Sequence, residues 1–400
     1  MNRYIHGYYS VKDKIFNTKI QALIYDTQIV KTNIVLEYCT QYRKHDSLVN
    51  WHFNDEVFSQ YNWTTEPENS LEYLYYERAK NLRDKYDYLI LYYSGGCDSH
   101  NMVMSFLNQG LKIDELVVHH VNSGMGILNN QGIDLTDAKI QPLTETKFQV
   151  VPRLKEILTV DPNIKIKMFD ATQKIIDTFS KKQSGEWVLK AREELNPVDS
   201  AKYNFTCFDE YKKIIDTSRK VGILVGLDKP NLKIHNNKMY LVFSDRRFNI
   251  NLFYTEIEEY SNAQVEFFYT SPDACNLICK QAHTLKNWLM SSEKILTKFM
   301  AINKNRNPTS YLFLEENARL LLYGHSWKAE WFQAKKSVLD WHSEADLWFH
   351  LAFPSDSIQG ACWRDGISYI QKHIDRSFLL NYNYSVYDGL QVFTKQYPIT

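Results

Sequence analysis

The sequence is poor in the residue patterns that mark a disulfide-stapled protein. It has six cysteines among 400 residues, and they do not follow a dense or regular spacing. They are Cys39, Cys97, Cys207, Cys275, Cys279 and Cys362. A reducing compartment is the simpler inference, so we expect a cytoplasmic protein.

A long apolar segment is also lacking. No run of about 18 apolar residues occurs, and the first residues, Met-Asn-Arg-Tyr-Ile-His, contain no apolar core of a signal peptide. Hydrophobic residues make up 44% of the chain, which is ordinary for a globular protein. We therefore expect a soluble chain with no membrane partner, large enough for two or three domains.

An excess of charge of either sign is absent. Lys plus Arg and Asp plus Glu each number 47, so the formal net charge is zero. Proteins that bind nucleic acids usually show a basic excess. The composition therefore does not indicate a nucleic-acid partner, although it is compatible with a local basic patch.

The most informative stretch of the sequence runs from Tyr88 to Leu107. Tyr88 to Tyr93 is a continuous apolar and aromatic run, which predicts a strand buried on both faces. The next residues are Ser94-Gly95-Gly96-Cys97-Asp98-Ser99, and two adjacent glycines allow a sharp turn. Apolar residues then recur at helical spacing as far as Leu107. The pattern predicts a strand, a glycine turn and a helix start in succession.

This succession is typical of a phosphate-binding loop. The amides at a helix N-terminus are unpaired and the helix dipole is positive there, so a bound anion is stabilised. Ser94 and Ser99 add hydroxyl donors, and Asp98 adds a carboxylate suited to Mg²⁺. The loop is not a Walker A motif, because no lysine follows Gly96. A purely structural turn between a strand and a helix is the alternative interpretation.

The six residues from Ser94 to Ser99 resemble the Ser-Gly-Gly-x-Asp-Ser loop of the N-type ATP pyrophosphatases, the PP-loop (adenine nucleotide alpha-hydrolase-like) superfamily. The resemblance covers residues 86 to 230. It implies an α/β fold with a parallel-sheet, Rossmann-like (HUP-like) core and α+β extensions at both ends. It also implies that ATP and Mg²⁺ bind, and that ATP is cleaved to AMP and pyrophosphate while an acceptor is adenylated.

The resemblance also assigns roles to the residues of the loop. Asp98 would ligate Mg²⁺ and take part in catalysis. The phosphates would be held by Ser94, Gly95, Gly96 and Ser99.

Two other loops follow predicted strands of the same sheet. Asp228 and Lys229 come after the apolar run that starts at Val221, where Asp228 would ligate metal and Lys229 would neutralise pyrophosphate. An exposed Asp-Lys-Pro turn is the equally acceptable alternative. Asn122 and Ser123 end the strand that starts at Glu115, and they would meet the adenine or ribose of ATP.

Signatures of other branches of the superfamily are missing. Neither the four-cysteine zinc site of 7-cyano-7-deazaguanine synthases nor the Cys-x-x-Cys pair of many tRNA-thiolating enzymes occurs. We interpret Cys275 and Cys279 as buried helix residues rather than zinc ligands. His119 and His120 would point to opposite faces of a strand and would not ligate one ion together.

Residue 2 is an asparagine rather than the nucleophilic cysteine of a glutaminase, so we expect no glutamine hydrolysis.

The sequence divides into three predicted regions. Residues 1–85 form a strand-rich extension ending in a helix, with strand-like pieces at Gln21–Tyr25 and Ile29–Tyr38 and a helix that starts at Ser70. Residues 86–290 form the ATP pyrophosphatase domain, in which Asp273 caps a helix that runs to about Met290. Residues 291–400 form an aromatic-rich C-terminal region.

We therefore expect an asparagine-synthetase-like adenylating ligase without its own glutaminase, of the stand-alone kind often encoded by bacteriophages. Its acceptor would be a carboxylate or nucleobase oxygen of an unknown small molecule or nucleobase, and a partner would supply ammonia or an amine. Two alternatives stay open. One is a catalytically inactive nucleotide-binding protein that docks partners, and the other is a tRNA- or nucleobase-modifying PP-loop enzyme.

Overall fold

The centre of the molecule is a five-stranded sheet in which every neighbouring pair of strands is parallel. The computed structural model describes residues 7–32, 48–133, 145–180, 185–189, 213, 219–226, 230–236, 238–245, 262–305, 308–328, 331, 344–374 and 392–400. The strands, in their order across the sheet, are β11 (Ala263–Phe267), β7 (Val221–Val225), β4 (Tyr88–Tyr92), β5 (Glu115–His120) and β6 (Lys165–Asp170).

The burial of the strands explains their composition. All five residues of β7 are buried, as are the last four of β4, which is why these strands are continuous apolar runs in the sequence. β6 lies at the edge of the sheet, and its residues are exposed or half-buried. The strands predicted to start at Tyr88, Glu115 and Val221 are thus confirmed as β4, β5 and β7.

The order of strands reverses beside β4. The chain passes from β4 to β5 and then to β6 on one side, and it returns to place β7 and β11 on the other side. In open parallel sheets, ligands bind outside the carboxyl ends of the strands at such a reversal. The loop from Ser94 to Ser99 follows β4 and lies at this position.

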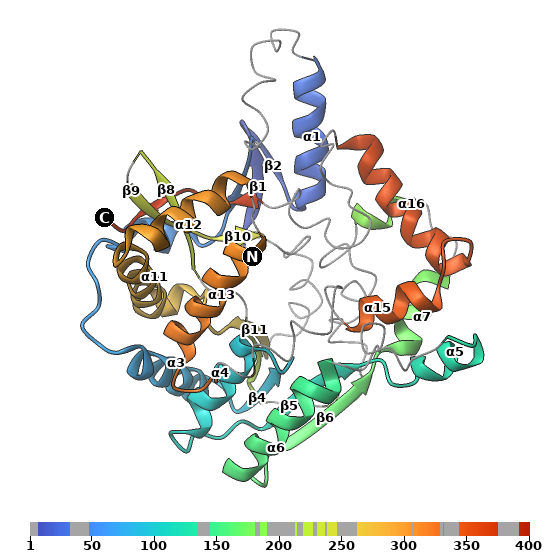
Figure 1. Cartoon of the computed structure of the whole chain (residues 1–400), viewed down its shortest axis with the longest axis horizontal. Coiled ribbons are helices and arrows are strands. Elements are labelled where there is room, and N and C mark those ends of the chain that lie inside the picture. Colours follow the sequence, from blue (N-terminus) through green and yellow to red (C-terminus); the bar gives the residue numbers. More distant parts are fainter. Residues whose placement is uncertain are drawn as a thin grey trace.

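Helices surround the sheet in two groups that are visible in Figure 1. The first group consists of α3 (Leu71–Lys85), α4 (Cys97–Leu107), α11 (Cys275–Met290), α12 (Glu293–Asn305) and α13 (Pro308–Tyr323), which pack on one another. The second group pairs α15 (Glu344–Ala352) with α5 (Gly124–Asn130) and α16 (Ile358–His373) with α7 (Thr172–Ser180). α6 (Val151–Val160) lies against α4 and is preceded by a π-helical turn, Thr146–Val150.

Smaller sheets join distant parts of the chain. β1 (Tyr8–Val11) pairs with β2 (Lys14–Phe16) and β3 (Val49–His52). The hairpin of β8 (Asn231–His235) and β9 (Lys238–Val242) is extended by β13 (Tyr397–Pro398), and β10 (Ser244–Asp245) pairs with β12 (Val392–Phe393). The chain end after residue 392 thus pairs with strands that follow β7.

Two helices near the N-terminus show where the sequence interpretation succeeded and where it failed. α3 begins as predicted, with the Ser70 side chain accepting a hydrogen bond from the Tyr73 amide at 3.2 Å. The strand predicted at Gln21–Tyr25 is wrong, because α1 covers Lys19–Thr32. The same helix contradicts the start of the strand predicted at Ile29–Tyr38, and the remainder of that range lies outside the described residues. Thr18 caps this helix through its hydroxyl and its carbonyl oxygen, and the buried residues recur at helical rather than alternating spacing. α2 (Asp55–Gln60) is a further short helix.

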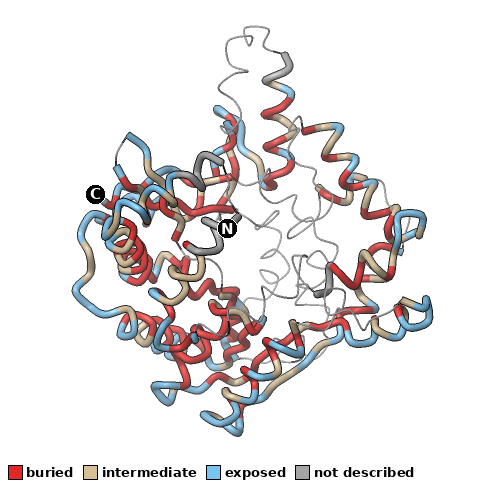
Figure 2. The backbone as a smooth tube through the Cα atoms, in the orientation of Figure 1, coloured by how far each residue is buried: buried red, intermediate tan, exposed pale blue. Residues whose placement is uncertain are grey.

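The structure confirms the predicted α/β class with a parallel, Rossmann-like sheet. The divisions of the chain at residues 85 and 290 stay predictions. Within the described ranges, no helix is both long and apolar enough to cross a membrane. Figure 2 shows that buried residues occur throughout the sheet and in the helices around it, and also in α1 and α16.

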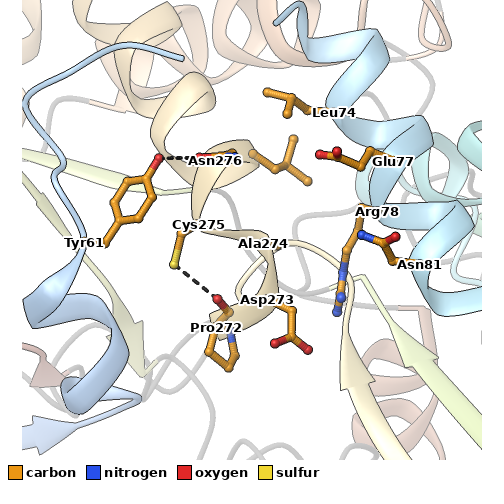
Figure 3. Close-up of a pocket in the computed structure, with 11 residues that line it drawn as sticks. Tyr61, Leu74, Glu77, Arg78, Asn81, Pro272, Asp273, Ala274, Cys275 and Asn276 are labelled. Atoms are coloured by element: carbon orange, nitrogen blue, oxygen red, sulfur yellow. Dashed lines mark hydrogen bonds between the residues drawn. The ribbon is translucent and has the colours of Figure 1, made fainter. Parts of the chain in front are cut away.

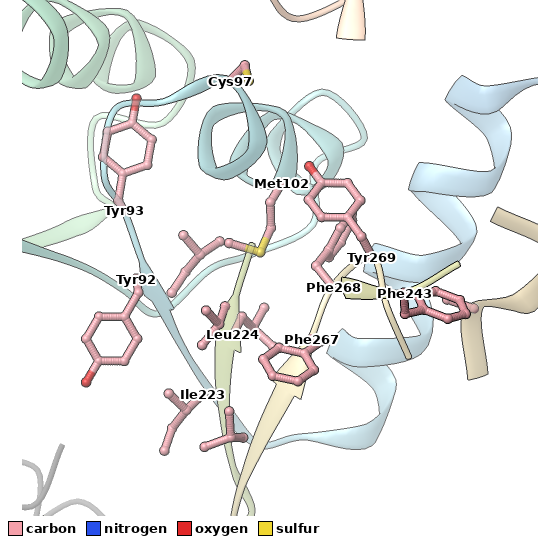
Figure 4. Packing of buried hydrophobic residues seen from close by; sticks show 14 of the residues in the cluster. Tyr92, Tyr93, Cys97, Met102, Ile223, Leu224, Phe243, Phe267, Phe268 and Tyr269 are labelled. Atoms are coloured by element: carbon pink, nitrogen blue, oxygen red, sulfur yellow. The ribbon is translucent and has the colours of Figure 1, made fainter. Parts of the chain in front are cut away.

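The core beside the loop is unusually rich in aromatic side chains (Figure 4). Met102 extends from α4 toward β7, where Leu224 is completely buried. Gly222 of β7 lies under Tyr86 and Leu89, and a Cβ atom at this position would come within 2.7 Å of the Tyr86 ring. The close approach of these residues therefore requires a glycine.

We expect Gly222→Ala to lower the free energy of unfolding by about 1–3 kcal/mol, because an added methyl group would overpack this contact. Urea unfolding of the purified chain measures the change. Gly126→Ala is the matched control, since the corresponding Cβ in α5 has no neighbour within 4 Å. The control is expected to be neutral or slightly stabilising. Equal stabilities of the two variants would contradict the packing argument.

Candidate functional site

The loop after β4 has the backbone that the sequence predicts. Gly95 has a φ of +70°, which favours glycine, and Gly96 is the N-cap residue of α4. A Cβ on Gly95 would lie 2.9 Å from the Val150 side chain, so the π-helical turn before α6 packs closely on the loop. The strand, glycine turn and helix start are thus confirmed, together with a close neighbour that the sequence did not reveal.

Two serine side chains brace this loop. The Ser94 amide donates to Ser99 Oγ at 3.2 Å, and the Ser99 hydroxyl donates to the Gly96 carbonyl oxygen at 3.1 Å. The Ser94 and Ser99 hydroxyl oxygens are also 3.2 Å apart. These bonds form within the loop and fix the turn.

Accessibility alternates along the loop. Ser94 is exposed, while Gly96 and Asp98 are half-buried. Gly95, Cys97 and Ser99 are buried. A ligand would therefore reach the loop from the side of Ser94, Gly96 and Asp98.

Asp98 is held by tyrosines from two distant segments. The Tyr323 hydroxyl, at the end of α13, donates to Asp98 Oδ1 at 2.8 Å. The Tyr269 hydroxyl, just after β11, donates to the Asp98 carbonyl oxygen at 2.6 Å. Burial raises the pKa of both tyrosines well above the usual value, so both hydroxyls stay protonated and act as donors.

The same network reaches the next turn of α4. Asn101 donates to the Tyr269 hydroxyl at 3.0 Å and accepts from Ser326 at 2.8 Å. All of these polar groups are buried in a region where an unpaired donor or acceptor would be costly. The first turns of α4 are therefore positioned by β11 and by the segment around α13.

The carboxyl end of β7 also approaches the loop. A Cβ on Gly226 would lie 3.3 Å from the Ser99 amide nitrogen, so the backbones of β7 and α4 nearly touch. Asp228 and Lys229 follow two and three residues later, but they lie outside the described residues. Their predicted roles stay predictions.

Asn122 and Ser123 lie at the end of β5, the neighbour of β4, and both are exposed. The Ser123 amide donates to Asp170 Oδ2 at 2.6 Å, and the Asn122 amide donates to His120 Nδ1 at 3.2 Å. Asp170 also accepts from the Thr172 amide at 3.0 Å. The two predicted nucleotide-binding residues thus share one sheet edge with the Ser94–Ser99 loop, and Asp170 fixes the backbone beside them.

Of the histidine and cysteine pairs, His120, Cys275 and Cys279 are buried and His119 is half-buried. His119 stacks on Tyr92, with ring centroids 5.4 Å apart, and does not join His120. Burial raises the pKa of Cys275 to about 12 and that of Cys279 to about 11. In the described part of the chain, no cluster of at least three His, Cys, Asp or Glu side chains is arranged to hold a metal.

A separate hollow lies between α3 and the start of α11 (Figure 3). Arg78 lines it, but its guanidinium is bound to the Phe267 and Phe268 carbonyl oxygens and to Glu266. Asp273 also lines it and does not cap the helix as predicted. A 3-10 turn, Pro272–Ala274, precedes α11, and Ser271 caps this turn by accepting from the Asp273 amide at 3.3 Å, while the N-cap residue of α11 itself is Ala274.

Comparisons of the chain with known proteins found no matching family model, no matching curated protein and no matching solved structure. Function is therefore inferred from the chain's own residues.

We expect Asp170→Asn to lower the free energy of unfolding by about 1–2 kcal/mol at neutral pH, because the carboxylate accepts from the amides beside β5 and α7. Burial raises the Asp170 pKa, but the hydrogen bonds from Thr172 and Ser123 outweigh burial and lower it. The stabilisation is therefore complete above the unfolded pKa, about 3.9, and is lost as pH falls through the lower folded pKa.

Urea unfolding of the parent protein and of Asp170→Asn, at pH 7 and at about pH 3, measures the difference in their free energies of unfolding. Asp177→Asn is the matched control, because its carboxylate accepts from Gln173 on the exposed surface of α7. A pH-independent difference between Asp170→Asn and the parent would contradict the assignment.

Proposed function

We propose that this chain binds Mg-ATP at the Ser94–Ser99 loop and cleaves it between the α- and β-phosphates to adenylate an acceptor. The observation that supports the proposal is the position of the loop. It joins a buried central strand to a helix N-terminus at the point where the strand order of a parallel sheet reverses.

The electrostatics of the loop suit the release of pyrophosphate. The start of α4 lies at the positive end of a helix dipole, and the amides of a first helical turn have no hydrogen-bond partner within their own helix. Such preorganised donors stabilise negative charge that develops on a leaving group. The exposed Ser94 hydroxyl and the half-buried backbone at Gly96 are the parts of the loop that phosphate oxygens would reach first.

Asp98 is suited to the metal ion that accompanies ATP. It lies at the start of α4, is partly accessible, and is oriented by Tyr323 through one carboxylate oxygen. Carboxylate oxygens are preferred ligands of Mg²⁺, which usually keeps several waters and binds phosphate oxygens as well. Asp98 would therefore hold the Mg²⁺ of Mg-ATP, with Asp228 as its predicted companion.

The acceptor is proposed as a carboxylate or nucleobase oxygen, and a partner would supply the amine or ammonia that displaces AMP. A nucleotide-binding protein without catalysis is the second candidate. It is favoured by the close cover of Gly95 by Val150 and by the hydrogen bond that Asp98 already accepts from Tyr323. The two candidates differ in whether ATP is turned over.

We expect a non-hydrolysable ATP analogue to bind only in the presence of Mg²⁺, and we expect Asp98→Ala to weaken this binding at least about tenfold. The loss follows from removal of the metal-ligating carboxylate. Titration calorimetry measures both effects. Asp84→Ala is the matched control, because Asp84 lies on the surface of α3 and pairs there with Lys80. Unchanged Mg-ATP affinity in Asp98→Ala would refute the role of Asp98.

Turnover should give AMP and pyrophosphate, and only with an acceptor present. A Walker-type enzyme breaks the β–γ bond with a lysine over that junction, and this loop has no such lysine. Lys229→Ala is expected to slow turnover about 10²-fold, the scale of one electrostatic donor. Chromatography after incubation with candidate acceptors measures the identity of the products and the rate at which the parent and Lys229→Ala form them. Formation of ADP and phosphate by the pure chain would contradict the proposed bond cleavage, and binding without turnover would favour the second candidate.

A further inference from the structure

A cluster of buried polar side chains lies beside the loop and has no assigned role. Its members are His100 in α4, Gln149 and Arg153 around the start of α6, and Trp327 after α13. Their exposed fractions are 0%, 2%, 2% and 4%, respectively. Within the described part of the chain, His100 Nε2, Gln149 Oε1, Arg153 Nε and Trp327 Nε1 have no hydrogen-bond partner.

The side chains of His100, Arg153 and Trp327 lie together, beside the ring of Trp331. The Arg153 guanidinium carbon lies 5.0 Å from the Trp327 ring centroid and 4.5 Å from that of Trp331. The His100 ring lies 6.2 Å and 5.3 Å from the same two rings. Arg153 also donates to the backbone carbonyl oxygen of Gln149 at 2.9 Å, so the π-helical turn before α6 contacts the guanidinium as well.

The cluster adjoins the Ser94–Ser99 loop. Val150, which packs on Gly95, precedes Arg153 by one helical turn. The Tyr93 hydroxyl, immediately before the loop, lies 3.0 Å from His100 Nδ1. The connection also passes through the π-helical turn Thr146–Val150, a distortion that is frequent at functional sites.

The cluster carries the positive charge of Arg153, which has no ion-pair partner among the described residues. No carboxylate of the described residues lies within ion-pair distance of Arg153, and Glu156 acts on it only at longer range. Burial, with a contribution from Arg153, lowers the pKa of His100 to about 3, so the histidine is neutral at pH 7. A buried, unpaired guanidinium is costly unless an anion joins it.

We propose that this cluster is an oxyanion site, in which Arg153 Nε–H and Trp327 Nε1–H bind one phosphoryl or carboxylate oxygen. His100 Nε2 adds a third donor in the tautomer whose Nδ1 accepts from Tyr93. The proposal rests on the proposed function, because the oxyanion belongs to a ligand at the adjacent loop. It is either an oxygen of the phosphate chain or the carboxylate of the acceptor.

The site would give the loop the positive charge that a Walker lysine supplies elsewhere. Arginine binds phosphate and carboxylate groups through a planar fork, and a desolvated cation acts more strongly than an exposed one. The flanking tryptophan rings hold the guanidinium in place by cation–π contacts. Arg153 would therefore act by binding an oxyanion and without transferring a proton.

The test follows the indole N–H signal of Trp327 in a ¹⁵N NMR spectrum, identified by its loss in Trp327→Phe. Inorganic pyrophosphate with Mg²⁺ and sodium acetate are added separately at equal ionic strength. A saturable shift with pyrophosphate assigns the site to the phosphate chain, and a shift with acetate assigns it to the acceptor carboxylate. If neither anion moves the signal, the proposal is overturned.

Arg153→Gln tests the same proposal by affinity. We expect it to weaken binding of the active anion about 10- to 100-fold and to abolish the indole shift, while Arg153→Lys restores part of the affinity. Lys155→Gln is the matched control, since it removes the same charge from the exposed face of α6. Parental affinity in Arg153→Gln would overturn the proposal.

The two levels of inference fail separately. If Mg-ATP binds with the expected dependence on Asp98 but the Trp327 signal and the Arg153 variants show no effect, the oxyanion site alone is wrong. If the parent protein does not bind Mg-ATP, the proposed function is wrong, whatever the anions do to the Trp327 signal. The indole shift in the parent protein decides the question even where Arg153→Gln does not fold.

Discussion

The geometry of the loop depends on two partly buried hydrogen bonds to Asp98. Tyr269 holds the carbonyl oxygen of this residue and Tyr323 holds its side chain, so β11 and α13 both fix the first turn of α4. A hydrogen bond to a charged group, such as that from Tyr323 to the Asp98 carboxylate, contributes about 1.5–3 kcal/mol. The two bonds preorganise the loop, which lowers the ordering cost of binding an anion.

Preorganisation also limits how a ligand enters. Val150 covers Gly95 and the serine hydroxyls are engaged in bracing the turn, whereas Ser94, Gly96 and Asp98 retain accessible surface. A metal ion bound to Asp98 would compete with Tyr323 for the same carboxylate or share it. This tyrosine thus links metal binding to the packing of α13.

The sequence predicted the central strands and the loop because their signals are local. A buried strand is a continuous apolar run, and a Gly-Gly pair before helical spacing marks a turn. The strand predicted at Gln21–Tyr25 was wrong because a short apolar run suits a strand and a helix equally, and tertiary burial decided for the helix. Ser271 rather than Asp273 caps the turn before α11, a choice that depends on backbone geometry which composition does not encode.

The partners of the loop were not predictable from sequence in the same way. Tyr323 is 225 residues away from Asp98 in the chain, and Arg153 meets Trp327 only through folding. Tyrosines and tryptophans are abundant in this sequence, so no pattern distinguishes these from core residues. Because Tyr323, Ser326 and Trp327 all follow residue 290, a fragment that ends there would lose the groups that orient Asp98 and Asn101. The aromatic C-terminal region is therefore part of the loop's physical support, whatever ligand the loop binds.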